Sequence, residues 1–335
     1  MARLMSKAVL TLALLAAPGL AFAADYQGSF EKTLTVSGPV DLNVMSGSGS
    51  ITVTPSSDGS VKVVGRIYAN MWRRMSGGGD IMDRVRKIEQ QPPILQEGSR
   101  ITVGKTGDDP LYENISISYD LQVPVATALG VNTGSGSVQV GALRGPVDAH
   151  SGSGSIKIGA TGGSVQASTG SGQITVDGAK GQLSANSGSG SIHLRGIAGD
   201  ATINTGSGSI EIEQTAAGTV RANNSSGSIK AWGLQGGLQA HTSSGSIRIQ
   251  GMPTDAWDVN SSSGSIHLDL PSEAKFTLRA HTNSGSINVD HPVTVQGAID
   301  KRRLEGNVRG GGPTVSARTS SGSIDINAGG GAVER

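Results

Sequence analysis

The residues of this sequence that could do chemistry recur as a short phrase of serine and glycine. The phrase Ser151-Gly-Ser-Gly-Ser155 and close variants of it return along most of the chain. Glycine-rich loops bind phosphates where a Gly-Lys-Ser/Thr run opens a helix, or where a dinucleotide fingerprint lies in a strand–helix–strand unit. Neither context is present. We therefore predict no phosphate or nucleotide site, and we interpret the glycines as residues that allow the unusual backbone dihedrals of a tight corner.

The six histidines are the second set of candidates. They do not recur at a spacing typical of a zinc site. Calcium-binding rolls place an aspartate in every turn, and here those positions are serine. The sequence therefore predicts no metal, no cofactor and no catalytic residue, and histidines that lie on the surface. Two of them, His193 and His267, face outward from the second strand of a coil. Three lie beside a corner, His150, His241 and His281, and His291 lies outside the repeats.

Hydroxyl residues are the third set. The residue after each central glycine of the phrase is nearly always serine, and the residue three before it is nearly always serine, threonine or asparagine. If the repeats stack, these side chains form ladders along one edge. Stacked hydroxyls could satisfy one another and the corner backbone, which is the interpretation we favour. They could instead form a regular surface that binds a glycan, an envelope polymer or ice.

A repeat must position all of these residues. The central glycine returns at intervals of 18 to 21 residues, with one longer interval of 37 residues before the last copy and an outlying copy, Gly49, ahead of the array. A fixed period of this length indicates a solenoid. The copies in the array are Gly136, Gly154, Gly172, Gly190, Gly208, Gly227, Gly245, Gly264, Gly285 and Gly322.

The apolar pattern within one period shows which solenoid this is. Val147 and Ala149 are two residues apart, as are Ile156 and Ile158, which is typical of half-buried strands. The two pairs are separated by an odd number of residues, so the chain must turn between them to keep both pairs inside. Each coil is therefore a strand, a Gly/Ser turn, a second strand and a Gly-rich turn. The sequence predicts an all-β parallel β-solenoid (β-helix or roll) with coils of about 18 residues and two short strands each.

Successive coils should stack in sequence order, so that Ile156, Ile174 and Ile192 form one buried file. On the same assumption, Asn260 lies between His241 and His281. The outward positions of the second strand mix positive, negative and neutral residues, without the charged groove and aromatic subsites of polysaccharide lyases. We therefore predict a non-enzymatic protein. The alternative is a carbohydrate-active enzyme or a glycan-binding protein that uses the solenoid flank, and an enzyme would need carboxylates clustered around a groove there.

The first residues have the features of an export signal. Arg3 and Lys7 precede the apolar run Ala8–Ala17, and Ala21-Phe-Ala23 matches a cleavage site. The run is too short to span a bilayer. We therefore expect an exported protein, in the periplasm, at the cell surface or outside the cell, with no transmembrane segment in the mature chain. The sequence has no cysteine, so we expect neither a disulfide nor a lipid anchor on cysteine.

The rest of the chain divides by its repeat pattern. Residues 66–93 interrupt the pattern with a cluster of basic residues, Arg73, Arg74, Arg84, Arg86 and Lys87, on a segment that predicts a short helix. This insert is either a contact surface or a cap for the open end of the solenoid. The predicted regions are a signal peptide (1–23), an N-terminal coil and cap (24–130) containing the insert (66–93), a repeat array (131–327) with an irregular insertion (291–313), and a flexible tail (328–335).

Three features together resemble a known family. They are the iterated Ser-Gly-Ser-Ile phrases, the lead-in Ile115-Ser-Ile-Ser-Tyr-Asp-Leu-Gln-Val-Pro124, and the closing segment from Arg302 to Ile326. With them the chain resembles the bacterial putative-adhesin domains of unknown function, which are Gly/Ser-rich β-solenoids of exported and cell-envelope proteins. The resemblance implies the same fold and brings no catalytic residues with it.

These observations together predict a function. We expect an exported, non-enzymatic, adhesin-like binding or structural module at the bacterial cell envelope. Its partner would be an envelope polymer, a glycan or a surface protein. The formal net charge of +1 gives no electrostatic reason to expect binding to nucleic acid. Nothing in the sequence indicates an oligomeric state.

Overall fold

The computed structural model describes residues 26–69, 79–105, 109–295 and 300–329. The predicted signal peptide (1–23) lies outside the described residues. So do Arg73 and Arg74 of the basic insert and residues 330–335 of the predicted tail.

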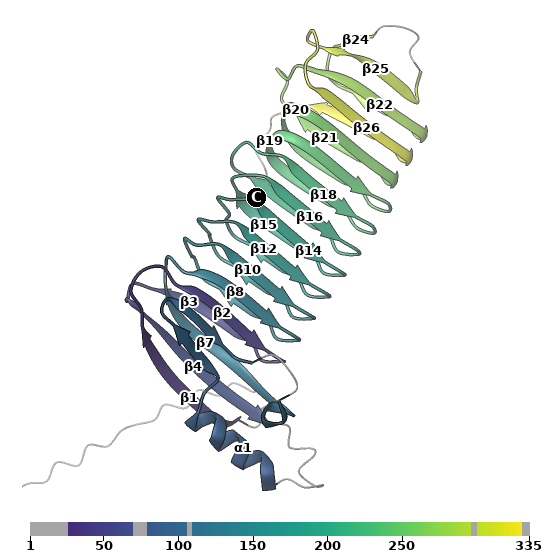
Figure 1. Cartoon of the computed structure of the whole chain (residues 1–335). Helices are drawn as coiled ribbons and strands as arrows, with labels where there is room; N and C mark the ends of the chain where they lie inside the picture. Colours follow the sequence, from purple (N-terminus) through teal and green to yellow (C-terminus); the bar gives the residue numbers. More distant parts are fainter. Residues whose placement is uncertain (1–25, 70–78, 106–108, 296–299, 330–335) are drawn as a thin grey trace, which may run out of the picture.

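The chain winds into a rod with two long faces, each a sheet of mostly parallel strands (Figure 1). We name the sheet formed by the first strand of each coil the first sheet, and the other the second sheet. The two sheets face each other across the core, and β19 and β20 continue round the corner from the second sheet into the first. The coils of the array are β8 (Ala128–Thr133) and β9 (Val138–Val140), β10 (Val147–Ser151) and β11 (Ile156–Ile158), β12 (Val165–Thr169) and β13 (Ile174–Val176), β14 (Leu183–Ser187) and β15 (Ile192–Ile197), β16 (Ala201–Thr205) and β17 (Ile210–Gln214), followed by β18 (Val220–Asn224), β19 (Ile229–Thr242), β20 (Ile247–Ser263) and β21 (Ile266–Leu270).

The core confirms the predicted stacking in this part of the chain. Ile156 pairs with Ile174 and Ile174 with Ile192, and their exposed fractions are 1%, 0% and 0%. The facing column of the first sheet is occupied by small buried residues such as Ala149 and Ala167. Large side chains therefore pack against small ones, which keeps the two sheets close together and explains the low aromatic content of 3%.

The order of the coils at the C-terminal end differs from the prediction. The last coil of the sequence, β26 (Thr314–Ser321) and β27 (Ile324–Ala328), does not lie at the end of the rod. It lies between the coil of β20 and β21 and the coil of β22 (Phe276–Ser284) and β23 (Ile287–Val289), pairing in parallel with both. The expectation of strict sequence order is therefore wrong here.

The segment between β22 and β26 explains this order. After β21 the chain skips one level and forms β22 and β23. It then adds β24 (Val293–Val295) and β25 (Arg303–Val308) as antiparallel strands on the outer edge of β22. The predicted irregular insertion, 291–313, is thus mostly a β-hairpin that reverses the chain. The last coil returns to the level that was left open (Figure 1).

The N-terminal end is built in the same way. The first coil, β2 (Asp41–Ser46) and β3 (Ile51–Ser56), lies between the array and a further pair of strands, β6 (Arg100–Val103) and β7 (Ile115–Pro124). Antiparallel strands then end both sheets: β4 (Ser60–Ala69) beside β7 and β1 (Tyr26–Thr35) beside β4 on one side, and β5 (Ile94–Glu97) beside β6 on the other. Both ends of the described chain therefore insert a coil one level inside the rod.

The predicted short helix is present as α1 (Gly79–Gln90), and it packs against β1. Its apolar side buries Val85 and Ile88, at 1% and 0% exposure. Glu89 accepts a hydrogen bond of 2.8 Å from the backbone N–H of Ser29, and Arg84 Nη1 donates to the carbonyl oxygens of Pro110 and Glu113 at 2.8 Å each. Arg84, one of the residues of the basic insert, therefore anchors the cap.

The position of the last coil can be tested with paired cysteines, because the chain has none of its own. Asp258 on β20 lies opposite Ser316 on β26, and Ser316 lies opposite Arg279 on β22. Neighbouring strands are about 4.8 Å apart, and a disulfide needs Cα atoms closer than about 7 Å. We expect the variant Asp258→Cys/Ser316→Cys to form a disulfide under mild oxidation, as measured by thiol titration. Asp258→Cys/Arg279→Cys should stay reduced. If instead only this second variant forms a disulfide, the coils are stacked in sequence order and the described position of the last coil is wrong.

Candidate functional site

The outer face of the first sheet presents an uncharged polar surface in its central part. We define the neutral face by the outward residues of β12, β14 and β16 in two adjacent columns. Each column continues from strand to strand in exact register, at about 4.8 Å per strand. The strands on either side carry charged residues at the equivalent outward positions, Asp148 on β10 and Arg221 on β18. The neutral face consists of Gln166, Ser184 and Thr202 in one column and Ser168, Asn186 and Asn204 in the other.

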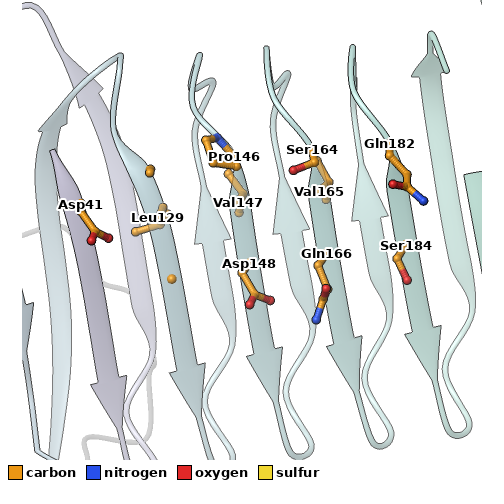
Figure 2. Close-up of a pocket in the computed structure, with 12 residues that line it drawn as sticks. Asp41, Leu129, Pro146, Val147, Asp148, Ser164, Val165, Gln166, Gln182 and Ser184 are labelled. Carbon is orange, nitrogen blue, oxygen red and sulfur yellow. The ribbon is translucent and has the colours of Figure 1, made fainter. Parts of the chain in front are cut away.

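A groove of about 450 Å³ lies at one end of this face, over β2, β8, β10, β12 and β14. Gly130 of β8 lies between Asn43 and Asp148 in the register and has no side chain, so the surface is hollow there. Figure 2 shows Asp148, Gln166 and Ser184 projecting from successive strands along the groove. The groove therefore continues onto the neutral face.

Two carboxylates line this groove, Asp41 and Asp148. They belong to β2 and β10, with β8 between them, and are offset by two residues, which places their Cα atoms about 12 Å apart. Asp41 accepts a hydrogen bond of 3.1 Å from Arg100 Nε, and an oxygen of Asp148 lies 2.7 Å from His150 Nε2. Both are therefore engaged by other side chains, and they do not form the close pair of free carboxylates of a glycosidase.

A ladder of asparagines lines a second hollow, of about 550 Å³, on the same face. Asn204 Nδ2 donates to Asn186 Oδ1 at 2.8 Å, and Asn223 Nδ2 donates to Asn204 Oδ1 at 3.0 Å. A side-chain amide has two N–H donors and an oxygen with two lone pairs. The ladder uses one donor and one lone pair of Asn204, so a donor and a lone pair remain for a ligand.

The hydroxyl column three residues before each glycine has a different role, because it is buried. Ser151 Oγ accepts from the Gly154 N–H and donates to the carbonyl oxygen of Gly136 in the preceding coil, at 2.9 Å each. Thr169 and Ser187 repeat the pattern. The hydroxyls therefore satisfy the corner backbone, as we favoured, but they bond to that backbone rather than to one another. This column is not a binding surface.

Several of the corner glycines also differ from the prediction. Gly154, Gly172 and Gly190 have no positive φ, so unusual dihedrals do not explain them. Instead, an ideal Cβ on Gly154 would lie 1.9 Å from the carbonyl oxygen of Gly136. The glycine is required because the backbones of neighbouring coils approach closely at this corner.

Most of the histidines lie at the surface, with one exception. His193 lies 3.0 Å from Glu211, and His267 lies 3.2 Å from Asp325. His291 is 4% exposed and packs edge-on against Phe276, with ring centroids 5.4 Å apart, so the surface prediction is wrong for this residue. Burial lowers the pKa of His291. In the part of the chain that the structure describes, no three His, Asp or Glu side chains group as metal ligands.

A further hollow of about 780 Å³ lies in the N-terminal cap, between the end of α1 and the β5–β6 hairpin. Its lining includes Lys87, Lys105 and Leu95, and Leu95 is 59% exposed. The side chain of Lys105 bonds to Asp109, which raises the pKa of Lys105. No pattern in the sequence predicts this hollow, although it is lined by Pro92 and Pro93, where the chain leaves the helix.

Two parallel sheets wound coil over coil around a thin aliphatic core define a parallel β-solenoid. The Toastrack DUF4097 family model matches residues 160–327, and the chain belongs to this family. The predicted resemblance to putative adhesin domains of unknown function is thereby confirmed. The described residues contain no helix with the length and apolar character needed to cross a membrane.

Two solved structures are similar to the chain. A putative cell adhesion protein from Clostridium sporogenes ATCC 15579 is 13% identical, with 90% of this chain and 100% of that chain covered and a TM-score of 0.26. A putative adhesin from Bacteroides fragilis NCTC 9343 is 12% identical, with 90% and 98% covered and a TM-score of 0.37. These values are too low to indicate what this chain binds. No curated protein matches the sequence.

Proposed function

We propose that the protein is exported and acts as a non-enzymatic binding module of the cell envelope. In this proposal the neutral face of the first sheet binds an uncharged glycan. The observation that carries the proposal is the register of the neutral face, where amides and hydroxyls follow one another on β12, β14 and β16 without a charge between them. The apolar run at the N-terminus and its small-residue cleavage site support export.

The geometry of the neutral face suits an extended polymer rich in hydroxyl groups. Each strand offers donors and acceptors at the same height, so a chain lying across the strands meets a similar set of partners at every step. The strands are held by the backbone ladder and the buried files, and the face therefore needs little ordering when it binds. An uncharged surface also avoids the cost of removing water from a charge.

The arrangement of the carboxylates supports binding rather than hydrolysis. Asp41 is engaged by Arg100, and Asp148 is engaged by His150. A glycan in the groove would therefore meet acceptors and donors without a paired general acid and nucleophile.

Binding can be measured with the mature chain and neutral glycans purified from an envelope fraction. The variant Asn186→Ala/Asn204→Ala removes two amides from the neutral face. Each hydrogen bond contributes about 0.5–1.5 kcal/mol, so we expect affinity to fall about tenfold. Gln139→Ala/Thr175→Ala on the outer face of the second sheet is the matched control and should bind like the unmodified protein.

Two results would overturn the proposal. One is that the unmodified protein retains none of the neutral glycans. The other is that the two double variants weaken binding equally. Export is tested separately, by fusing residues 1–30 to a reporter that is active only after export. A fusion that stays inactive would contradict that part of the proposal.

A further inference from the structure

The inserted last coil brings basic side chains together that are distant in the sequence. His281 on β22 lies opposite Arg318 on β26 and opposite Arg303 on β25. All three positions are on the outer face of the first sheet, about 4.8 Å apart from strand to strand. Strict sequence order would have placed Asn260 beside His281 instead. The cluster therefore exists only because β26 lies between β20 and β22.

These residues line a hollow of about 480 Å³ near the C-terminal end of the rod. Arg303 donates to Glu305 Oε1 through Nε at 3.1 Å and through Nη2 at 2.9 Å. Arg318 Nη1 lies 3.5 Å from Asp258 Oδ1. The lining residues are Arg279, Ala280, His281, Arg303, Glu305 and Arg318.

Arg279 is exposed, as Arg303 and Arg318 are, and it differs from them in being free to bind. Within the described residues its guanidinium makes no hydrogen bond or ion pair, whereas Arg303 and Arg318 are each held by one carboxylate. Arg279 lies opposite Glu305 on one side and Ser316 on the other. Its five N–H donors can therefore turn toward a ligand in the hollow.

The charge balance of the hollow favours an anion. Three guanidinium groups and a single carboxylate line it. Arginine stays positively charged under all ordinary conditions, and its planar fork matches the oxygens of a carboxylate or phosphate. Like charges on adjacent strands repel, and an anion bound between them would relieve that repulsion.

We propose that this hollow binds an oxyanion, the carboxylate or phosphate group of an acidic polymer, with Arg279 as its main ligand. Arg303 and Arg318 flank the bound group, and Glu305 and Asp258 hold these two side chains in place. The proposal does not rest on the glycan site, because the neutral face lies on β12 to β16 and the hollow lies on β22, β25 and β26.

The test is calorimetric titration of the mature chain at low salt with two probes, polygalacturonate for carboxylates and tripolyphosphate for phosphates. We expect at least one probe to bind, and the one that binds more tightly identifies the oxyanion. Arg279→Gln should weaken binding at least tenfold. The control is Arg221→Gln, because Arg221 lies in the same outward column four strands away and is not part of the hollow. It should change the affinity less than twofold.

Three further measurements make the result decisive. Arg303→Gln should also weaken binding, and it provides a second variant for the test if Arg279→Gln does not fold. Binding should fall as salt is raised. Asn186→Ala/Asn204→Ala should leave oxyanion binding unchanged, which separates this proposal from the glycan site. The proposal is overturned if neither probe binds, or if Arg279→Gln and Arg221→Gln behave alike.

Discussion

Gly190→Ala is expected to destabilise the solenoid strongly. The added Cβ would lie 1.8 Å from the carbonyl oxygen of Gly172 and 2.4 Å from its carbonyl carbon. Both are backbone atoms, so no side-chain movement can relieve the overlap. The two coils would have to separate, which would stretch the ladder between β15 and β13 and the contacts of the Ser187 hydroxyl. We expect the free energy of unfolding to fall by at least about 3 kcal/mol, as measured by urea denaturation.

Gly47→Ala is the matched control for this prediction. Gly47 belongs to the same Ser-Gly-Ser-Gly phrase in the first coil, but a Cβ there would meet no atom within 4 Å. Its φ is not positive either. Stability should therefore change by less than about 0.5 kcal/mol. Equal stability of the two variants would show that close approach of the coils is not what requires glycine.

Truncation after residue 313 is expected to unfold much more than the segment it removes. The deletion takes away β26 and β27, which pair with β20 and β21 on one side and with β22 and β23 on the other. Without them, β22 keeps only the antiparallel strands β25 and β24 on its outer edge, and β23 loses its partner β27. The remaining small sheet has no neighbouring coil against which to bury its apolar face, so it should be barely stable in water. We expect β22, β23, β24 and β25 to lose their hydrogen-exchange protection, while coils up to β19 remain protected because each still has neighbours.

Truncation after Gly329 is the control, because it leaves β26 and β27 intact. The bond from the Gly329 N–H to the Leu270 carbonyl oxygen, 3.0 Å, is also kept. Its exchange pattern should match that of the full mature chain. If the chain truncated after residue 313 keeps full protection in β22, the inserted coil is not what holds the C-terminal end together.

The coil itself was predictable from the sequence because it depends on local patterns. Alternation of apolar and polar residues determines which side chains face inward, and the odd step between Ala149 and Ile156 requires a corner. The period then aligns equivalent residues of successive coils. The buried files, the two sheets and the short helix therefore follow from the sequence, and the structure has them.

The candidate sites were harder to predict from the sequence than the coil. The neutral face can be located once the outward positions of the first strand are aligned, since Asn186 and Asn204 occupy equivalent places in the repeat. The roles of Gly154 and His291 could not be found in this way. One depends on how closely two backbones approach, and the other on which surface covers a side chain after the chain reverses.

The sequence by itself determined that this protein is a β-solenoid and which residues of each coil face inward. Only the tertiary structure decided the order of the coils at its ends. The physical reason is that every coil presents the same backbone ladder and the same apolar files, so nearly any coil can stack on any other. The coil of β22 and β23 skips one level, and the β24–β25 hairpin then reverses the chain so that β26 fills that level, which places Arg318 beside His281.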